Sequence, residues 1–138
     1  MWDDIERKKI LIVDDEEKFL AVTKKNLEKS GPYEVRIESR VSEVIPAVKE
    51  FKPDLIILDV MMPDRRGSEI AYEIRNTDKI KQIPILFLTA TAMKGQKELF
   101  GGLVDGLPFT IKPTVSKPVS TADLIKAIES QLPKPTDE

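Results

Sequence analysis

The sequence contains no cysteine and no histidine. Without cysteine the chain can form neither a disulfide nor a thiolate metal site, and nothing in it marks an oxidising compartment. Without histidine it lacks the commonest general base in enzymes. Chemistry that depends on either residue type is therefore excluded.

Long hydrophobic runs and an excess of one charge are also missing. No apolar stretch approaches the roughly 20 residues that a membrane span requires, and the N-terminus has no signal-peptide core. The 22 basic and 24 acidic side chains leave a net charge of -2, which gives no electrostatic attraction to nucleic acid or an anionic membrane. We expect a cytoplasmic protein of one domain that binds neither nucleic acid nor membrane.

Two short apolar runs each end in acidic residues. Residues 10–13 and 55–58 contain only isoleucine, leucine and valine, which is typical of parallel strands that are buried on both faces. The first run is followed by Asp14 and Asp15, and the second by Asp59. Ligands of open α/β sheets bind at the carboxyl ends of the strands, so these three carboxylates are candidates for one site.

Apolar strands alternate with amphipathic helices along the chain, and the pattern weakens after the fourth strand. The pattern predicts strands at residues 10–13, 33–37, 55–58, 85–88 and, less clearly, 109–111, with helices at 17–29, 43–51, 69–75 and 121–132. Ser42 is a candidate cap of the second helix, and Ser120 or Thr121 of the last. Repeated βα units predict an α/β fold, a doubly wound five-stranded parallel sheet of flavodoxin-like order 2-1-3-4-5 with helices on both faces.

In that strand order Asp14, Asp15 and Asp59 converge where the order reverses. An isolated Asp14-Asp15 pair could simply cap the following helix, because aspartate is common in turns. Three carboxylates at adjacent strand ends, however, repel one another unless a cation offsets their charge. A site made of oxygen ligands prefers Mg²⁺, Mn²⁺ or Ca²⁺.

Four segments resemble those of the two-component response-regulator receiver domain. They are Ile-Val-Asp-Asp-Glu at 12–16, Asp-Leu-Ile-Ile-Leu-Asp-Val-Met-Met-Pro at 54–63, Pro-Ile-Leu-Phe-Leu-Thr-Ala at 84–90 and a later Lys-Pro. The resemblance covers residues 9–132, which leaves 1–8 as an N-terminal lead and 133–138 as a polar tail. No output domain follows, so we expect either a stand-alone receiver or one domain of a longer protein.

The resemblance implies a phosphoryl-accepting site. Asp59 would be the phosphorylated carboxylate, and Mg²⁺ would be held by Asp14, Asp15, Asp59 and the backbone carbonyl of Met61. Such a domain catalyses at most its own phosphorylation and dephosphorylation, and is not a substrate-turnover enzyme.

Residues of the last two strands would bind the phosphoryl group. The resemblance implies that the Thr89 hydroxyl and a lysine each bind one phosphoryl oxygen, and that the small side chain of Ala90 leaves the group accessible. An aromatic residue of the fifth strand would then follow Thr89 inward and alter the signalling surface. Without the resemblance, Thr89 is equally well explained as an ordinary strand residue.

The lysine is ambiguous because Lys-Pro occurs twice. Lys112 has Phe109 three residues before it, where the family places its switch aromatic. Lys117 has Thr114 at that position but is followed by Val119-Ser120 at the usual distance from the last helix. We prefer Lys112 with Phe109 and keep Lys117 as the alternative; the rejected lysine would be a solvated loop charge.

The predicted function is a phosphoacceptor switch of a two-component phosphorelay. Without histidine, the chain must receive phosphate from a sensor histidine kinase, a phosphotransfer protein or a small phosphodonor, and it would signal to a downstream protein partner through a surface change. The alternative is a phosphorylation-independent pseudo-receiver that serves as a protein-interaction module.

Two other classes fit poorly. A flavodoxin-like carrier needs a phosphate-binding loop after the first strand, where this chain has four consecutive acidic residues. A phosphatase with an aspartyl nucleophile needs a second catalytic acid just after Asp59, and Val60, Met61 and Met62 supply none.

Overall fold

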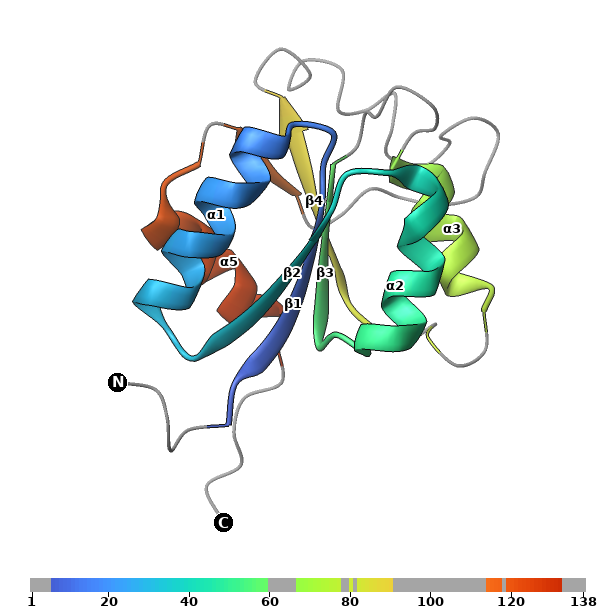
Figure 1. Cartoon of the computed structure of the whole chain (residues 1–138), viewed down its shortest axis with the longest axis horizontal. Coiled ribbons are helices and arrows are strands. Elements are labelled where there is room, and N and C mark those ends of the chain that lie inside the picture. The colour runs from blue at the N-terminus through green and yellow to red at the C-terminus, as the bar shows by residue number, and fades with distance from the viewer. Residues whose placement is uncertain are drawn as a thin grey trace.

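Strands and helices alternate along the computed structural model, which describes residues 6–59, 67–77, 80, 82–90, 114–117 and 119–132 (Figure 1). The strands are β1 Lys8–Val13, β2 Tyr33–Glu38, β3 Leu55–Asp59, β4 Ile85–Ala90 and β5 Thr114–Lys117. The helices are α1 Glu17–Ser30, α2 Val44–Phe51, α3 Gly67–Arg75 and α5 Thr121–Gln131, with a 3₁₀ turn, η1, at Val41–Glu43. Within these ranges, no helix is both long enough and apolar enough to cross a membrane.

The five strands form one parallel sheet in the order β2-β1-β3-β4-β5. Figure 1 shows the sheet edge-on, with α1 and α5 covering one face and α2 and α3 the other. The predicted fold, strand order and placement of helices on both faces are therefore confirmed.

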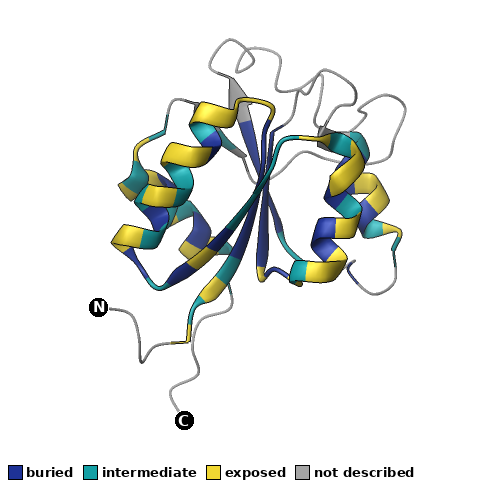
Figure 2. Cartoon of the chain, viewed as in Figure 1, coloured by how far each residue is buried: buried dark blue, intermediate teal, exposed yellow. Residues whose placement is uncertain are grey.

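Each face of the sheet has its own hydrophobic core. Ile10 and Ile12 of β1 pack into the core under α1 and α5, whereas Leu11 and Val13 pack into the core under α2 and α3. Because successive side chains of a strand point to opposite faces, a strand buried on both sides must be apolar throughout. Figure 2 shows the resulting buried layer along the central strands, with exposed residues on the outer faces of the helices.

The second helix begins one residue later than predicted. Ser42 lies in η1, and Glu43 is the N-cap of α2, without a side-chain capping hydrogen bond. Pro46 explains the shift, because its nitrogen carries no hydrogen and is tolerated only among the first helical positions. A start at Val44 keeps Pro46 within those positions. The last helix is capped as predicted, since the Ser120 hydroxyl accepts a hydrogen bond from the Asp123 N–H at 3.1 Å.

The position predicted for the fifth strand was wrong. The strand that pairs with β4 is Thr114–Lys117, whereas the prediction placed it at residues 109–111, which lie outside the described residues. Both segments follow a proline and lead into a Lys-Pro pair, so their local patterns are nearly equivalent. Only the pairing with β4 distinguishes them.

Candidate functional site

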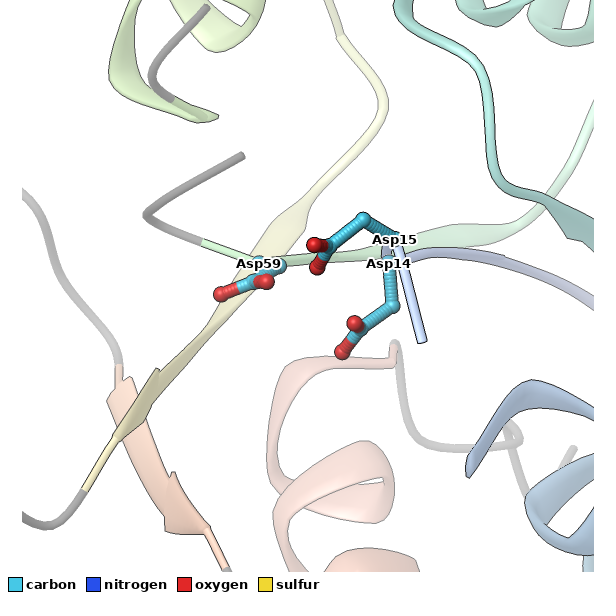
Figure 3. A group of neighbouring side chains, drawn as sticks. All are labelled: Asp14, Asp15 and Asp59. Carbon is cyan, nitrogen blue, oxygen red and sulfur yellow. The ribbon is translucent and has the colours of Figure 1, made fainter. Parts of the chain in front are cut away.

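Three carboxylates lie together at the carboxyl ends of the two central strands. Asp14 and Asp15 directly follow β1, and Asp59 is the last residue of β3. The two strands are paired, with Val13 opposite Leu58, so the residues that follow lie at the same edge of the sheet. Each aspartate offers one oxygen, and these oxygens all lie within 4.8 Å of one another (Figure 3). The predicted convergence of the three residues is confirmed.

The three side chains differ in exposure. Asp14 is completely buried and Asp59 is 7% exposed, whereas Asp15 is exposed to solvent. An Oδ1 atom of Asp14 accepts a hydrogen bond from the Glu16 N–H at 2.9 Å, which stabilises the turn from β1 into α1. The N-cap of α1 is Glu16, so neither Asp14 nor Asp15 is the helix cap. Asp14 therefore acts both in the turn and in the carboxylate group.

The carboxylate group fits a hard divalent cation. Negative charges at this separation repel one another, and the repulsion is stronger where burial keeps water away. All three donors are carboxylate oxygens, which are preferred ligands of Mg²⁺, Mn²⁺ and Ca²⁺. The exposed Asp15 leaves the group open to solvent on one side, so that water and a further ligand have access. Met61, whose carbonyl the family resemblance adds to this set, lies outside the described residues.

The ends of β4 and β5 complete this edge of the sheet. Asp59 pairs with Leu88, so Thr89 lies one residue beyond Asp59 on the adjacent strand. Next along the sheet, Thr89 pairs with Ser116 and Ala90 with Lys117. The backbone thus brings Thr89 and Ala90 to the same edge as the aspartates.

The register of β5 also bears on the choice between the two lysines. Lys117 ends the strand adjacent to Thr89 and Ala90, whereas Lys112 and Phe109 lie outside the described residues. The signal in the sequence that favours Lys117 is the short connection between it and the N-cap Ser120 of α5.

The comparisons with known proteins agree with this geometry. The family model for the response regulator receiver domain matches residues 10–129. The chain is 31% identical over 127 residues to the polar-differentiation response regulator DivK of Brucella anthropi, which covers 91% of this chain and 96% of that protein.

Solved structures with the same fold include two receiver domains. A CheY-like response regulator receiver domain protein of Methanospirillum hungatei is 27% identical, with a TM-score of 0.72 over 90% of this chain and 92% of that one. The receiver domain of a sensor histidine kinase of Pseudomonas aeruginosa, whose structure has a magnesium ion coordinated in the active-site cleft, is 24% identical, with a TM-score of 0.74 over 91% of this chain and 97% of that one. The family model and the relationship to DivK show that the chain belongs to the response regulator receiver family, in agreement with the carboxylate geometry.

Proposed function

We propose that the chain is a phosphoacceptor switch that receives a phosphoryl group on the carboxylate of Asp59. The observation that carries the proposal is the position of Asp59 at the end of a central strand, with one of its oxygens within 4.8 Å of oxygens of Asp14 and Asp15. A buried carboxylate next to two others destabilises the fold through charge repulsion unless a cation is bound there, so such a group is typical of a functional site. Family membership supports the same conclusion.

The proposed transfer forms one bond to phosphorus and breaks another. An Asp59 oxygen forms a bond to phosphorus while the bond between phosphorus and the donor atom breaks, and the electron pair of that bond leaves with the donor. When the donor is the phosphohistidine of a kinase or phosphotransfer protein, the leaving nitrogen belongs to an imidazole. Asp59 becomes an acyl phosphate, and catalysis consists mainly of holding the reacting atoms in line and offsetting the charge.

Asp14 and Asp15 are well placed to hold Mg²⁺, which when bound neutralises phosphoryl oxygens. The Mg²⁺-bound receiver domain of Pseudomonas aeruginosa has the same fold and supports this choice of metal. Following the family pattern, we add the carbonyl of Met61 as a further ligand. The Asp14 carboxylate is held in one orientation, because it is buried and accepts a hydrogen bond from the Glu16 N–H.

For the lysine that binds the phosphoryl group we propose Lys117 in place of Lys112. The pairing of Ala90 with Lys117 supports this choice, because it brings Lys117 to the strand end next to Thr89. Thr89 would bind another phosphoryl oxygen through its hydroxyl, and Ala90 would leave room for the group. With Lys117 in this role, the residue three positions before the lysine is Thr114 and not Phe109, so readout through an aromatic strand residue is no longer part of the proposal.

The test is intact-mass spectrometry after incubation with Mg²⁺ and phosphoramidate. Wild type should gain one phosphoryl adduct, and Asp59→Asn should gain none. Omission of Mg²⁺ in the presence of a chelator should suppress the adduct. If wild type remains unmodified with phosphoramidate and with a panel of phosphorylated histidine phosphotransfer proteins, the phosphoacceptor function is contradicted and the pseudo-receiver function is favoured.

A further inference from the structure

A cavity lies between α1 and the carboxyl end of the edge strand β2. Its volume is about 610 Å³, and it is separate from the Asp14, Asp15 and Asp59 group. Helix α1 contributes Glu17, Leu20 and Ala21, strand β2 contributes Ile37 and Glu38, and the following segment contributes Ser39, Arg40 and Glu43. The phosphoacceptor function does not use this cavity.

The cavity combines an apolar floor with a mainly acidic lining. Leu20 belongs to the hydrophobic core under α1 and α5, and the partly buried Ile37 packs against that core, so the floor is continuous with the packed interior. Three glutamates and one arginine line the cavity, which leaves an excess of negative charge. The Ser39 hydroxyl donates a hydrogen bond to Glu17 at 3.5 Å, which is long and therefore weak.

The charge of Glu38 is incompletely compensated. Burial raises the pKa of Glu38 above its ordinary value; of the nearby charges, Arg36 and Arg40 oppose this shift and Glu43 adds to it. The Arg36 guanidinium lies 3.8 Å from Glu38 but only 2.9 Å from Glu50, so its closer ion pair is directed away from the cavity. A further cation at the cavity would therefore be favourable.

The edge of β2 next to the cavity offers backbone hydrogen-bonding groups. The Glu38 carbonyl accepts a hydrogen bond from the N–H of Asp14, the residue after β1. Alternation along the strand turns the N–H and C=O of Val35 and Ile37 outward. At Val35 both groups are bonded within the chain, because its N–H donates to Glu28 at 2.9 Å and its C=O accepts from Lys24 at 2.7 Å. At Ile37, neither group bonds to any residue in the part of the chain that the structure describes.

We propose that this cavity binds an arginine side chain carried by an extended segment of a protein partner, whose backbone pairs with Ile37. The guanidinium has a planar array of donors that suits several carboxylates at once, and its aliphatic stem can lie on the apolar floor. The backbone of the segment would extend the sheet at its edge, a common mode of peptide recognition.

The arrangement at Val35 defines where the partner segment lies. Lys24 and Glu28, which are 3.1 Å apart, occupy the outward backbone groups of Val35 and prevent strand addition along the first half of β2. Only the end of β2 that adjoins the cavity remains available. The backbone contact and the acidic lining are thus next to each other, as recognition of a single basic residue in an extended segment requires.

The experiment is an NMR titration of the full chain, with backbone amide shifts as the readout and the peptide acetyl-Val-Arg-Val-amide as the probe. We expect saturable shifts at Ala21, Ile37, Glu38 and Ser39. Replacement of the peptide arginine by glutamine should weaken binding about fivefold, the effect of a partly exposed charge contact. Methylation of the backbone nitrogen of the peptide arginine should weaken binding as well, because that nitrogen could no longer donate to the edge strand.

Variants of the protein provide matched controls. Glu38→Gln and Glu17→Gln should each weaken binding of the arginine peptide, whereas Glu34→Gln, on an exposed residue of the same strand that does not line the cavity, should leave it unchanged. Equal affinity for the arginine and glutamine peptides, shifts that map elsewhere, or unchanged affinity of Glu38→Gln would overturn the proposal. So would binding of Mg²⁺ alone at these residues without any effect of the peptide. The amide spectrum of each variant reports directly whether it is folded.

Discussion

Ala90 and Lys117 are paired residues at the carboxyl ends of β4 and β5. This pairing aligns the last strand with the strand that carries Thr89 and brings a lysine to the edge of the sheet where the three aspartates converge. It thereby supports the proposed choice of Lys117 between two Lys-Pro pairs that are locally almost identical in sequence.

The first prediction concerns these two lysines. Lys117→Ala should lower the rate of phosphorylation by phosphoramidate about 10- to 100-fold. The variant lacks the positive charge that would bind an oxygen of the transferred phosphoryl group. Lys112→Ala is the matched control and should stay within about twofold of wild type, as expected for a solvated loop charge. Intact-mass time courses give both rates. A larger loss in Lys112→Ala than in Lys117→Ala would contradict the assignment.

Mg²⁺ should stabilise the folded protein through the carboxylate group. At a concentration ten times its Kd the gain is about 1.4 kcal/mol, because the ion binds the folded state alone. For a domain of this size that gain raises the Tm by about 5 °C. Thermal unfolding with MgCl₂ against NaCl of equal ionic strength measures the effect.

Asp15→Asn should abolish that Mg²⁺-dependent rise in Tm. Asp15 is the suitable position because it is exposed, so its substitution disturbs folding less than substitution of the buried Asp14. Asp123→Asn, in the first turn of α5, is a control that should keep the full rise. An equal rise in all three proteins would place the ion elsewhere.

The C-terminus of α2 is held in a strained backbone conformation. Lys52 has a φ of 53° and a ψ of 61°, in the left-handed region, while its N–H donates to the Val48 carbonyl at 2.9 Å. Lys52→Gly should increase the free energy of unfolding by about 0.5–1 kcal/mol, because glycine adopts this conformation without a steric penalty. Lys49→Gly, within the same helix, should instead lower it by about 1 kcal/mol. Urea unfolding of both variants tests the difference.

Glu38 should make the stability depend on pH in the acidic range. Because burial raises its pKa, the folded state binds this proton more tightly than the unfolded state does. The contribution of Glu38 is therefore favourable below the ordinary glutamate pKa and is lost as pH rises through the raised value.

Glu38→Gln should remove the loss of stability that ionisation of Glu38 causes as pH rises. The free energy of unfolding of the variant, relative to wild type, should increase from pH 4 to pH 7, as urea unfolding at both pH values would show. A constant difference between the two proteins across this range would mean that Glu38 titrates alike in both states.

The residues that define the fold were readable from the sequence because their burial requires a distinctive pattern. Residues 10–13 and 55–58 are covered on both faces and can therefore contain no polar residue, and the aspartates that follow them mark where each strand leaves the sheet. Strand order then brings Asp14, Asp15 and Asp59 together.

What could not be predicted depends on tertiary pairing. The segments 109–112 and 114–117 share flanking prolines, strand-forming residues and a terminal lysine, so their local patterns do not decide which one pairs with β4. Likewise, Ser42 is a good cap by residue type, but the position of Pro46 moves the start of α2 to Val44. The cavity beside Ile37 results from the packing of α1 against β2 and leaves no periodic signal in the sequence.

The most direct measurement locates the phosphoryl group on the chain. Borohydride reduces an aspartyl phosphate to homoserine, which tandem mass spectrometry of proteolytic peptides assigns to a single position. After incubation with Mg²⁺ and phosphoramidate, we expect homoserine at position 59 and at no other aspartate. Homoserine at position 14 or 15, or a phosphoryl adduct that persists in Asp59→Asn, would contradict the role of Asp59 as the phosphoacceptor.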